Sequence, residues 1–305
     1  METTEQIWMD GEFIPWKQAT THVLTHTLHY GAGVFEGIRF YDTEDGAAIF
    51  RLRDHIVRLF HSADAIHMQI PYSIDAIVAA TKELIKRNGI TSGYIRPIAF
   101  YGYGKMGLNP GGAPVNIAVA CWPWPAYLGD RPIRVKTSKY IRIHPKSSET
   151  QAKICGHYVN SIMASLDIHR QGYDEGLLLD FEGNVAEGPG ENIFIIRHGR
   201  LMTPKSGNIL PGITRDSIKT IAEENGIIFE ETTLTLEDIY QAEEALFVGT
   251  AAEVTAIASV DDNALEKVPG PITSKLKAQY LDIVHGKTRK YEKWLTYVKS
   301  SGHHR

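Results

Sequence analysis

The pattern of apolar and polar residues in the first part of the chain predicts strands interleaved with helices. Two short apolar runs, residues 7–9 and 12–14, flank an Asp-Gly pair that is typical of a β-hairpin turn. Residues 94–101 and 115–122 have the β-branched and aromatic content of longer strands. Because Pro97 has no backbone N–H, the first of these strands is expected at a sheet edge or at a bulge.

Two helices are predicted between those strands. Apolar residues recur every three or four positions from Ile56 to Ile66, and Asp54 is the expected N-cap. The same spacing covers residues 74–85, and Asn88-Gly89 is a typical helix end.

The second half of the chain continues as short strands and helices. Helices are predicted over residues 157–171 and 214–224, the second capped by Thr214, and residues 140–143 are predicted to be a strand. Apolar spacing near the C-terminus predicts two final helices, the last carrying Tyr291 to Val298.

A proline-rich segment, residues 123–132, is the expected domain boundary, because three prolines and a glycine cannot continue a helix or a central strand. At 305 residues the chain exceeds the usual size of one domain. We therefore expect residues 1–122 and 133–305 to be two domains joined by a hinge. Trp124 and Tyr127 are unusual in an inert linker and suggest that the hinge also lines a pocket.

Composition limits the classes of partner. The net charge of -4 argues against nucleic acid or an anionic membrane surface as the main partner. Cys121 and Cys155 are too few to imply a disulfide framework. The N-terminus shows no export signal, and no stretch has the roughly 20 apolar residues that a membrane helix needs. A cytoplasmic protein is expected.

The strongest candidate for chemistry is Lys153, which lies among small and apolar residues just before a predicted helix. Desolvation disfavours the ammonium form, so such a lysine can act as a neutral amine and attack a carbonyl. Tyr158 follows five residues later, and Glu187 lies in a turn further along. An amine, a phenol and a carboxylate are the groups required by a cofactor with an aldehyde on a pyridine ring. Taken alone, a solvated surface lysine is the simpler interpretation.

Several motifs, in one order over nearly the whole chain, strengthen that hypothesis. They are His29-Tyr30-Gly31, Phe35-Glu36-Gly37-Ile38-Arg39, Tyr94-Ile95-Arg96-Pro97, Lys153 to Tyr158, Glu187 to Phe194, Leu210-Pro211-Gly212-Ile213-Thr214-Arg215 and Gly249-Thr250-Ala251-Ala252-Glu253. Together they resemble the branched-chain amino acid aminotransferases, class IV enzymes that use pyridoxal phosphate (PLP). The resemblance implies a two-domain α+β fold of type IV, with a small α/β N-terminal domain, a larger pseudo-barrel C-terminal domain and PLP at their interface. Pro189 departs from the family pattern, which has a small residue such as alanine or serine there.

The resemblance also implies roles for the cofactor residues. Lys153 forms a Schiff base with PLP and then moves the substrate α-proton, Glu187 contacts the pyridine nitrogen, and Tyr158 binds the cofactor O3′. For Tyr158, a core tyrosine is the alternative. The residues expected at the phosphate are Arg58, Ile213, Thr214 and Thr250. Helical periodicity alone would instead place Arg58 on the solvated side of its helix.

A substrate pocket of this family must accept both an aliphatic side chain and the second carboxylate of glutamate. The expected apolar walls are Tyr30, Phe35, Leu108, Trp124 and Tyr127, and the expected carboxylate contacts are Tyr94, Arg96, Thr250 and Ala251. Arg39 is a further carboxylate candidate, or an ion-pair partner for Glu36 or Asp42. In the family, Tyr30 and the loop leucine reach a neighbouring subunit, which implies a homodimer or a larger assembly of dimers.

The implied reaction is ping-pong transamination between branched-chain L-amino acids and 2-oxoglutarate, which gives branched 2-oxo acids and L-glutamate in branched-chain amino acid biosynthesis. D-amino acid aminotransferases, (R)-amine transaminases and aminodeoxychorismate lyase share the fold and are alternatives. A cofactor-free binding protein on this scaffold is another, and it predicts a colourless protein. The 13 histidines show no paired ligand spacing, so no metal is expected.

Overall fold

The computed structural model describes residues 2–125 and 127–298, and these form two compact units. Within the described residues, the first unit comprises residues 2–125, 152–156 and 282–298, and the second comprises residues 127–151 and 157–281. Two later segments belong to the first unit because they pair with its strands: Ile154 bridges to Val34, and the last strand pairs with Ala47 to Phe50. The predicted domain ranges, 1–122 and 133–305, do not assign these two later segments to the first unit. The ranges stay a prediction.

The first unit is built on an antiparallel sheet, whose described strands follow the order β17-β5-β4-β6-β7-β1-β2, with β3 also paired to β6. The strands are β1 (Gln6–Met9), β2 (Glu12–Pro15), β3 (Gly33–Phe35), β4 (Ile38–Thr43), β5 (Gly46–Phe50), β6 (Gly93–Tyr101), β7 (Val115–Trp122) and β17 (Leu295–Val298). The predicted hairpin is confirmed, because Met9 pairs with Glu12 across a turn in which Gly11 has a φ of 96°.

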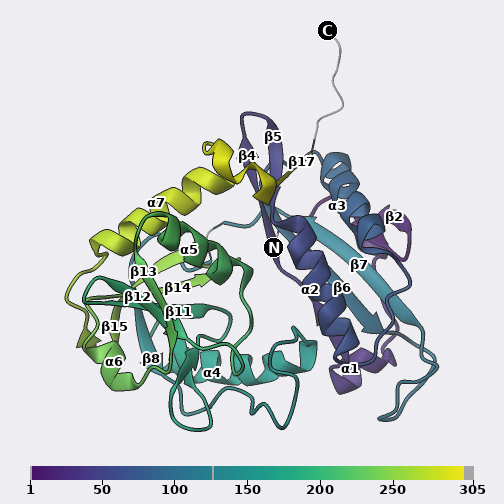
Figure 1. Ribbon diagram of the computed structural model, residues 1–305. Helices are drawn as coiled ribbons and strands as arrows, with labels where there is room; N and C mark the ends of the chain where they lie inside the picture. The colour runs from purple at the N-terminus through teal and green to yellow at the C-terminus, as the bar shows by residue number, and fades with distance from the viewer. Residues whose placement is uncertain (1, 126, 299–305) are drawn as a thin grey trace. The chain divides into compact units, whose positions relative to one another are not determined.

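Helices α2 (Leu52–Asp64) and α3 (Ile74–Asn88) pack on one face of this sheet (Figure 1), and a short helix α1 (His26–Tyr30) precedes β3. The helical spacing is confirmed: Ile56 and Leu59 of α2 are fully buried in the core. Gly89 caps α3 with a φ of 62°. Asp54 is wrong as the cap of α2. The N-cap is Arg51, and Asp54 lies in the first helical turn, where its carboxylate pairs with Arg51.

Pro97 lies in the interior of the sheet, so the prediction of an edge or a bulge is wrong. On one side β6 pairs with β7 along its whole length, and on the other its partner changes from β4 to β3 at Pro97. The Pro97 carbonyl accepts from Glu36 N at 2.9 Å, so the missing N–H faces the junction between β3 and β4. A proline is tolerated there because the ladder is already interrupted.

The second unit has a mixed sheet, whose described strands follow the order β10-β9-β8-β15-β14-β11-β12-β13, with β16 also paired to β15. Its strands are β8 (Ile133–Thr137), β9 (Glu175–Leu179), β10 (Val185–Glu187), β11 (Asn192–Arg197), β12 (Arg200–Pro204), β13 (Ile228–Thr232), β14 (Glu244–Gly249), β15 (Glu253–Val260) and β16 (Asn263–Ala264). Strand β8 runs parallel to β9 and β15, and β12 runs parallel to β13. Ile193, Phe247 and Ile257 are among the buried residues of its core.

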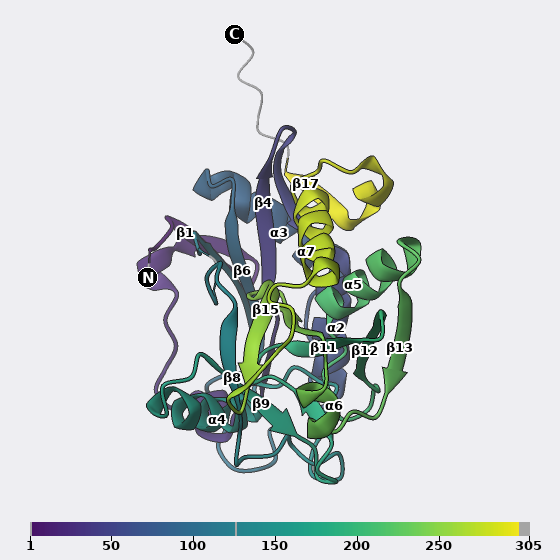
Figure 2. The ribbon, with the colours of Figure 1, turned by 90° about the vertical axis from the view of Figure 1, so that its left-hand side faces the viewer.

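The remaining helices are α4 (Tyr158–Arg170), α5 (Ile213–Glu224), α6 (Leu236–Tyr240) and α7 (Pro271–Val284), and Figure 2 shows α5, α6 and α7 around β11 to β15. Thr214 is wrong as the cap of α5, which begins at Ile213 after Gly212. Residues 140–143 form no strand, although Arg142 N donates to Leu179 O of β9 at 2.7 Å.

The end of the chain also differs from the prediction of two helices. A 3-10 helix (Arg289–Trp294) is followed by β17, because Leu295 to Val298 pair antiparallel with β5. The α+β class is confirmed. None of the described helices is both long enough and apolar enough to cross a membrane.

Candidate active-site residues

Lys153 lies in the first unit, on a segment fixed through its backbone. Its N–H donates to Ser62 Oγ on α2 at 2.9 Å, and its carbonyl accepts from Phe35 N at 3.1 Å. The next residue, Ile154, bridges to Val34 of β3. The side chain is half-buried, and Nζ lies 5.0 Å from the centroid of the Phe35 ring. The backbone of Lys153 is therefore held in place by α2 and β3.

A thiol that could compete with Lys153 as the nucleophile, that of Cys155, lies two residues after it. Burial raises the pKa of the Cys155 thiol to about 11, although the nearby charges of Arg96 and Lys153 lower it. Because the thiolate is the reactive form, Cys155 is not the nucleophile near neutral pH.

Phe35, Tyr94 and Arg96, three predicted substrate residues, lie together in the first unit. The Arg96 guanidinium lies 4.8 Å from the Phe35 ring centroid and 5.4 Å from that of Tyr94. Arg96 Nε is buried and has no hydrogen-bond partner among the described residues. An unsatisfied guanidinium N–H beside aromatic rings is suited to a planar carboxylate from a ligand.

Glycine is required at position 37 by this cluster. A Cβ there would lie 1.8 Å from the Tyr94 hydroxyl, which is far inside contact distance. Tyr94 packs edge-on against Trp124, with ring centroids 4.5 Å apart. Tyr94 thus sits between the Gly37 backbone and an aromatic side chain from the predicted hinge.

Arg39 reaches the start of the predicted hinge. Its Nη1 donates to Trp124 O at 3.1 Å and its Nη2 to Pro125 O at 2.9 Å. Its buried guanidinium therefore anchors this segment. Its possible partner Glu36 binds His55 and Arg58.

Tyr30 contacts Gly107, the residue before Leu108, at an exposed place of the first unit. Gly107 N donates to the Tyr30 hydroxyl at 3.3 Å, and His26 of α1 contacts Gly107 O at 2.8 Å. Leu108 is 87% exposed and Tyr30 is 41% exposed. These contacts hold the glycine-rich loop, which carries Leu108, against α1.

Arg58 is only 10% exposed, so the solvated position predicted from helical periodicity is wrong. Its Nε and Nη2 both bind the carboxylate of Glu36, at 2.6 and 2.9 Å. His55 and Arg58, two polar residues of α2, both bind the buried carboxylate of Glu36.

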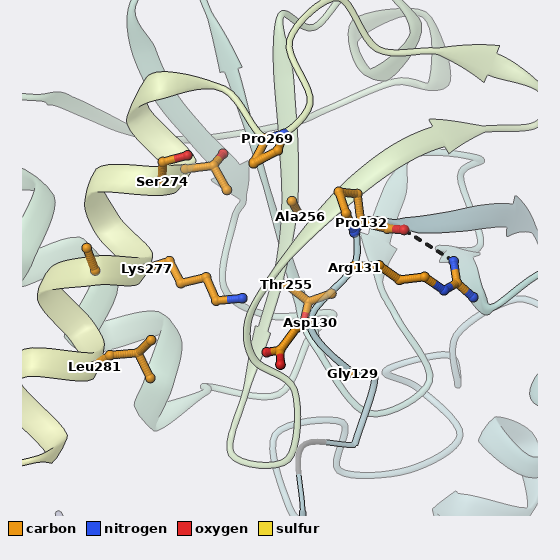
Figure 3. A pocket seen from close by; sticks show the side chains of 12 residues that line it. Gly129, Asp130, Arg131, Pro132, Thr255, Ala256, Pro269, Ser274, Lys277 and Leu281 are labelled. Atoms are coloured by element: carbon orange, nitrogen blue, oxygen red, sulfur yellow. Dashed lines mark hydrogen bonds between the residues drawn. The ribbon is translucent and has the colours of Figure 1, made fainter.

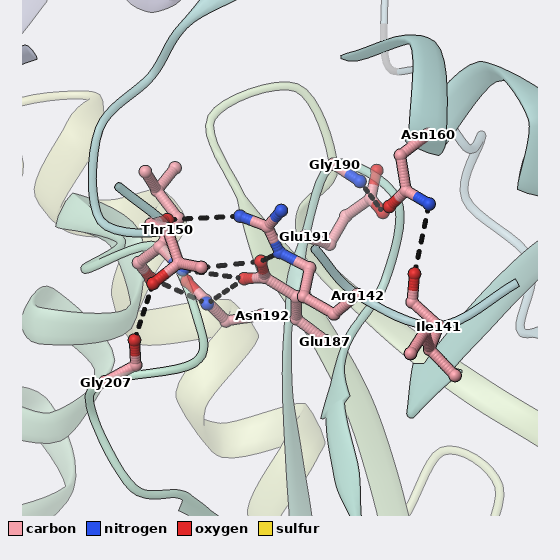
Figure 4. Close-up of polar contacts among 10 residues, drawn as sticks. Ile141, Arg142, Thr150, Asn160, Glu187, Gly190, Glu191, Asn192 and Gly207 are labelled. Carbon is pink, nitrogen blue, oxygen red and sulfur yellow. Dashed lines mark hydrogen bonds and ion pairs between the residues drawn. The ribbon is translucent and has the colours of Figure 1, made fainter. Parts of the chain in front are cut away.

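Glu187 is the centre of a buried polar group in the second unit (Figure 4). Its carboxylate accepts from Arg142 Nε, from Asn192 Nδ2 at 3.0 Å and from Leu210 N at 3.1 Å. Arg142 also donates to Thr150 O at 3.2 Å. Glu187 is 5% exposed, so a cation and neutral donors take the place of water around its carboxylate.

The other predicted cofactor residues of the second unit lie at the ends of elements. Ile213 and Thr214 are buried in the first turn of α5, where Gly212 supplies no side-chain cap. Thr250 and Ala251 form the turn between β14 and β15, and Tyr158 begins α4. A helix N-terminus and a tight turn offer backbone N–H groups that favour an anion such as phosphate.

Tyr127 and residues 128–132 of the predicted hinge belong to the second unit, whereas residues 123–125 belong to the first. Burial, together with the smaller effect of the charges of Glu175 and Glu191, raises the pKa of Tyr127 to about 12. Residues 129–132 line a cavity of about 280 Å³ together with residues of α7. Asp130 and, from α7, Lys277 project into it (Figure 3). Residues 129–132 of the hinge therefore border a pocket, and Trp124 and Tyr127 are not among the residues that line it.

Some polar partners were not found from the sequence: His55 beside Glu36, and Arg142 and Asn192 beside Glu187. The only signal for Asn192 was its place within the motif from Glu187 to Phe194. In the described part of the chain, no group of three or more His, Cys, Asp or Glu side chains is placed to hold a metal ion.

Comparison with known proteins identifies the family of the chain. The model of the family amino-transferase class IV matches residues 33–260. A branched-chain-amino-acid aminotransferase from Pseudomonas aeruginosa is 50% identical over 298 residues, which cover 96% of this chain and 97% of that protein. Two crystal structures of a T.th. branched-chain amino acid aminotransferase also match. One is complexed with N-(5'-phosphopyridoxyl)-L-glutamate and the other with 4-methylvaleric acid. Each matches with a TM-score of 0.94 and 42% identity, over 98% of this chain and 100% of the other. The chain therefore belongs to the class IV aminotransferases, with their type IV fold, and within them to the branched-chain amino acid aminotransferases.

Proposed function

We propose that this protein is a PLP-dependent aminotransferase that exchanges the amino group between branched-chain L-amino acids and 2-oxoglutarate. The observation that carries the proposal is the 50% identity, over 96% of the chain, to a branched-chain-amino-acid aminotransferase. The two T.th. complexes support the two substrates, since one ligand contains L-glutamate and 4-methylvaleric acid is the carbon skeleton of leucine without its amino group. These relatives favour branched-chain L-amino acids over D-amino acids or amines.

The side chains of this chain fit PLP. Glu187 is a buried carboxylate suited to a protonated pyridine nitrogen, the start of α5 is suited to a phosphate, and Lys153 supplies an amine beside the Phe35 ring. When bound, PLP supplies an electron sink for negative charge at the substrate α-carbon.

We assign the reactive amine to Lys153. Its Nζ would hold the cofactor carbonyl carbon and, once released, move the proton at the substrate α-carbon. Because Ser62 and Phe35 fix the Lys153 backbone, only the side chain has to move between these tasks. Glu187 would hold negative charge beside the ring nitrogen, with Arg142 and Asn192 keeping its carboxylate in place.

The remaining roles follow the family pattern. Tyr158 would bind the cofactor hydroxyl, and the phosphate would lie on Arg58, Ile213, Thr214 and Thr250. The buried, unpartnered Nε of Arg96 supports its role with the side-chain carboxylate of glutamate. The α-carboxylate would lie on Tyr94, Thr250 and Ala251. Further contacts are proposed for Tyr30, Phe35, Arg39, Leu108, Trp124 and Tyr127.

We also propose a homodimer as the working unit. Helix α4 carries Val159, Ile162, Met163 and Leu166 along one face, and their side chains are 42–58% exposed. An exposed apolar stripe at helical spacing is stabilised when a second chain covers it. Replacing Ile162 with glutamate should shift the mass measured by light scattering from dimer to monomer. A wild-type monomer at micromolar concentration would contradict this assembly.

The cellular setting is proposed from chemistry alone. Both cysteines are free thiols, which agrees with a reducing compartment such as the cytoplasm. There the enzyme would serve branched-chain amino acid biosynthesis, because its reaction forms these amino acids when L-glutamate is the amino donor.

Turnover of L-leucine with 2-oxoglutarate tests the function. Lys153→Ala should abolish turnover, whereas Lys146→Ala, which changes an exposed lysine, should not. Borohydride reduction of the holoenzyme followed by peptide mapping should place the label on Lys153. Activity with D-alanine or an (R)-amine but not with L-leucine would overturn the proposed substrate class, and a colourless protein would overturn the cofactor.

A further inference from the structure

The first unit buries a polar triad, Glu36, His55 and Arg58, that the proposed chemistry does not use as a whole. Glu36 follows β3 and is fully buried, and the other two residues lie one turn apart on α2. Glu36 Oε1 accepts from Arg58 Nε at 2.6 Å. Glu36 Oε2 accepts from Arg58 Nη2 at 2.9 Å and from His55 Nδ1 at 2.7 Å.

The protonation states of the triad follow from burial and charge. Burial alone would raise the pKa of Glu36, but the charge of Arg58 and the hydrogen bond from His55 outweigh it and hold the pKa well below its usual range. Burial lowers the pKa of His55, and the charges of Arg58 and Lys153 lower it further, against the raising effect of Glu36. His55 is therefore a neutral ring that donates from Nδ1.

The contact with Glu36 fixes how the Arg58 guanidinium is turned. The carboxylate occupies the edge formed by Nε and Nη2, so in a planar guanidinium Nη1 points away from Glu36. Glu36 is fixed in turn by His55 and by the Gly37 N–H at 3.3 Å. An arginine with this support presents its donors in one direction instead of sampling many rotamers.

We propose that Glu36 and His55 are positioning residues that direct the Arg58 guanidinium toward the cofactor phosphate. The inference rests on the proposed function, in which Arg58 binds that phosphate. Glu36 cancels the charge of Arg58, so the pair attracts a phosphate through directed N–H groups and not through net charge. Two mechanisms can therefore be separated by removing the charge of Glu36. If net charge governs binding, this change raises the affinity for PLP. If the orientation of Arg58 governs binding, the same change lowers that affinity.

The test compares binding of PLP with binding of pyridoxal, which lacks the phosphate, to the full-length protein after cofactor removal. Glu36→Gln and His55→Leu should weaken PLP binding about tenfold or more, as expected for lost hydrogen bonds to a charged group, and leave pyridoxal binding unchanged. His55→Asn keeps an N–H near the place of Nδ1 and should bind PLP almost as the wild type does.

Thr81→Val is the matched control, because it removes a buried side-chain hydrogen bond from α3 of the same unit, Thr81 Oγ1 to Ile77 O at 2.7 Å. It should change the affinity for neither ligand. Equal weakening of PLP and pyridoxal in the Glu36 and His55 variants would show a merely structural role. Unchanged or tighter PLP binding in these variants would also overturn the inference.

Arg58→Met separates this inference from the function on which it rests. If Arg58→Met lowers the preference for PLP over pyridoxal but Glu36→Gln and His55→Leu do not, only the positioning role fails. If Arg58→Met leaves that preference unchanged, the phosphate assignment fails and the positioning role fails with it. Should Glu36→Gln not fold, the pair of His55 variants decides between the outcomes.

Discussion

Replacing Gly37 with alanine tests the geometry around Tyr94 directly. The new Cβ would lie 1.8 Å from the Tyr94 hydroxyl, whereas real Cβ contacts are essentially never shorter than 3.0 Å, so the phenol must move. Tyr94 is 5% exposed and its ring is packed against Trp124, so this displacement has to be shared by a buried aromatic cluster. The substitution therefore disturbs a core and a proposed substrate contact together.

The expected magnitudes follow from these two effects. Overpacking a core costs about 1–3 kcal/mol, which for a chain of this size lowers Tm by about 2–6 °C. Displacing a substrate-positioning group by about 1 Å can cost about 100-fold in rate. We expect Gly37→Ala to lower Tm within this range and to lower kcat/KM for L-leucine by one to two orders of magnitude.

Gly89→Ala is the control, because it makes the same chemical change at a helix end with a φ of 62° and with nothing within 4 Å of the new Cβ. It should cost about 1 kcal/mol through the backbone alone and leave kcat/KM unchanged. The double variant Gly37→Ala/Tyr94→Phe should regain part of the lost Tm, since the hydroxyl is the nearest atom. If Gly37→Ala matches Gly89→Ala in both Tm and kcat/KM, the reasoning is refuted.

Three further outcomes are expected. The folded-state pKa values of Glu36 and His55 both lie below their ordinary values of 4.5 and 6.5, so in acid the unfolded state binds more protons than the folded state. Tm should therefore fall as the pH drops below about 6.5 and fall further below about 4.5. The first decline should be smaller in His55→Asn. Glu244 accepts from two backbone N–H groups in the first turn of α7, so Glu244→Ala should lower stability by about 1–2 kcal/mol, seen as a lower Tm with unchanged kcat. Arg142→Met removes the guanidinium from the buried carboxylate of Glu187 and should lower the free energy of unfolding by about 3–5 kcal/mol. It should also weaken PLP retention in equilibrium dialysis, and Arg142→Lys should restore part of that retention.

Local patterns were sufficient for the elements whose burial is one-sided and whose ends carry clear signals. Helix α3 and the β1–β2 hairpin are examples, since helical spacing with Gly89 and the Asp-Gly turn specify them locally. Strand β17 was missed because its structure depends on pairing with β5, which is far away in sequence. The position of Pro97 was misjudged for the same reason, because the interruption that tolerates it lies in the neighbouring strands.

The candidate site shows the same division. Lys153, Glu187 and Arg96 were predicted from residues next to them in sequence and from motifs that are continuous in sequence. Their supporting partners are not: Arg142 lies 45 residues from Glu187, and His55 lies 19 residues from Glu36. A histidine at helical spacing predicts only a face of the helix, and the tertiary fold decides that the face meets a carboxylate.

The two buried Arg–Glu pairs also argue for function on energetic grounds. Replacing a buried ion pair by apolar residues is often neutral or stabilising, so such a pair is weak support for a stabilising role. Glu36 and Glu187 are at most 5% exposed and each binds an arginine, whereas the exposed pair Arg53–Asp75 contributes little either way. The two carboxylates differ in their partners. Glu36 binds His55 and two nitrogens of Arg58, Nε and Nη2. Glu187 binds Nε of Arg142 and neutral amide groups. Glu36 is thus suited to orienting a cation within the protein, and Glu187 to holding negative charge for a ligand.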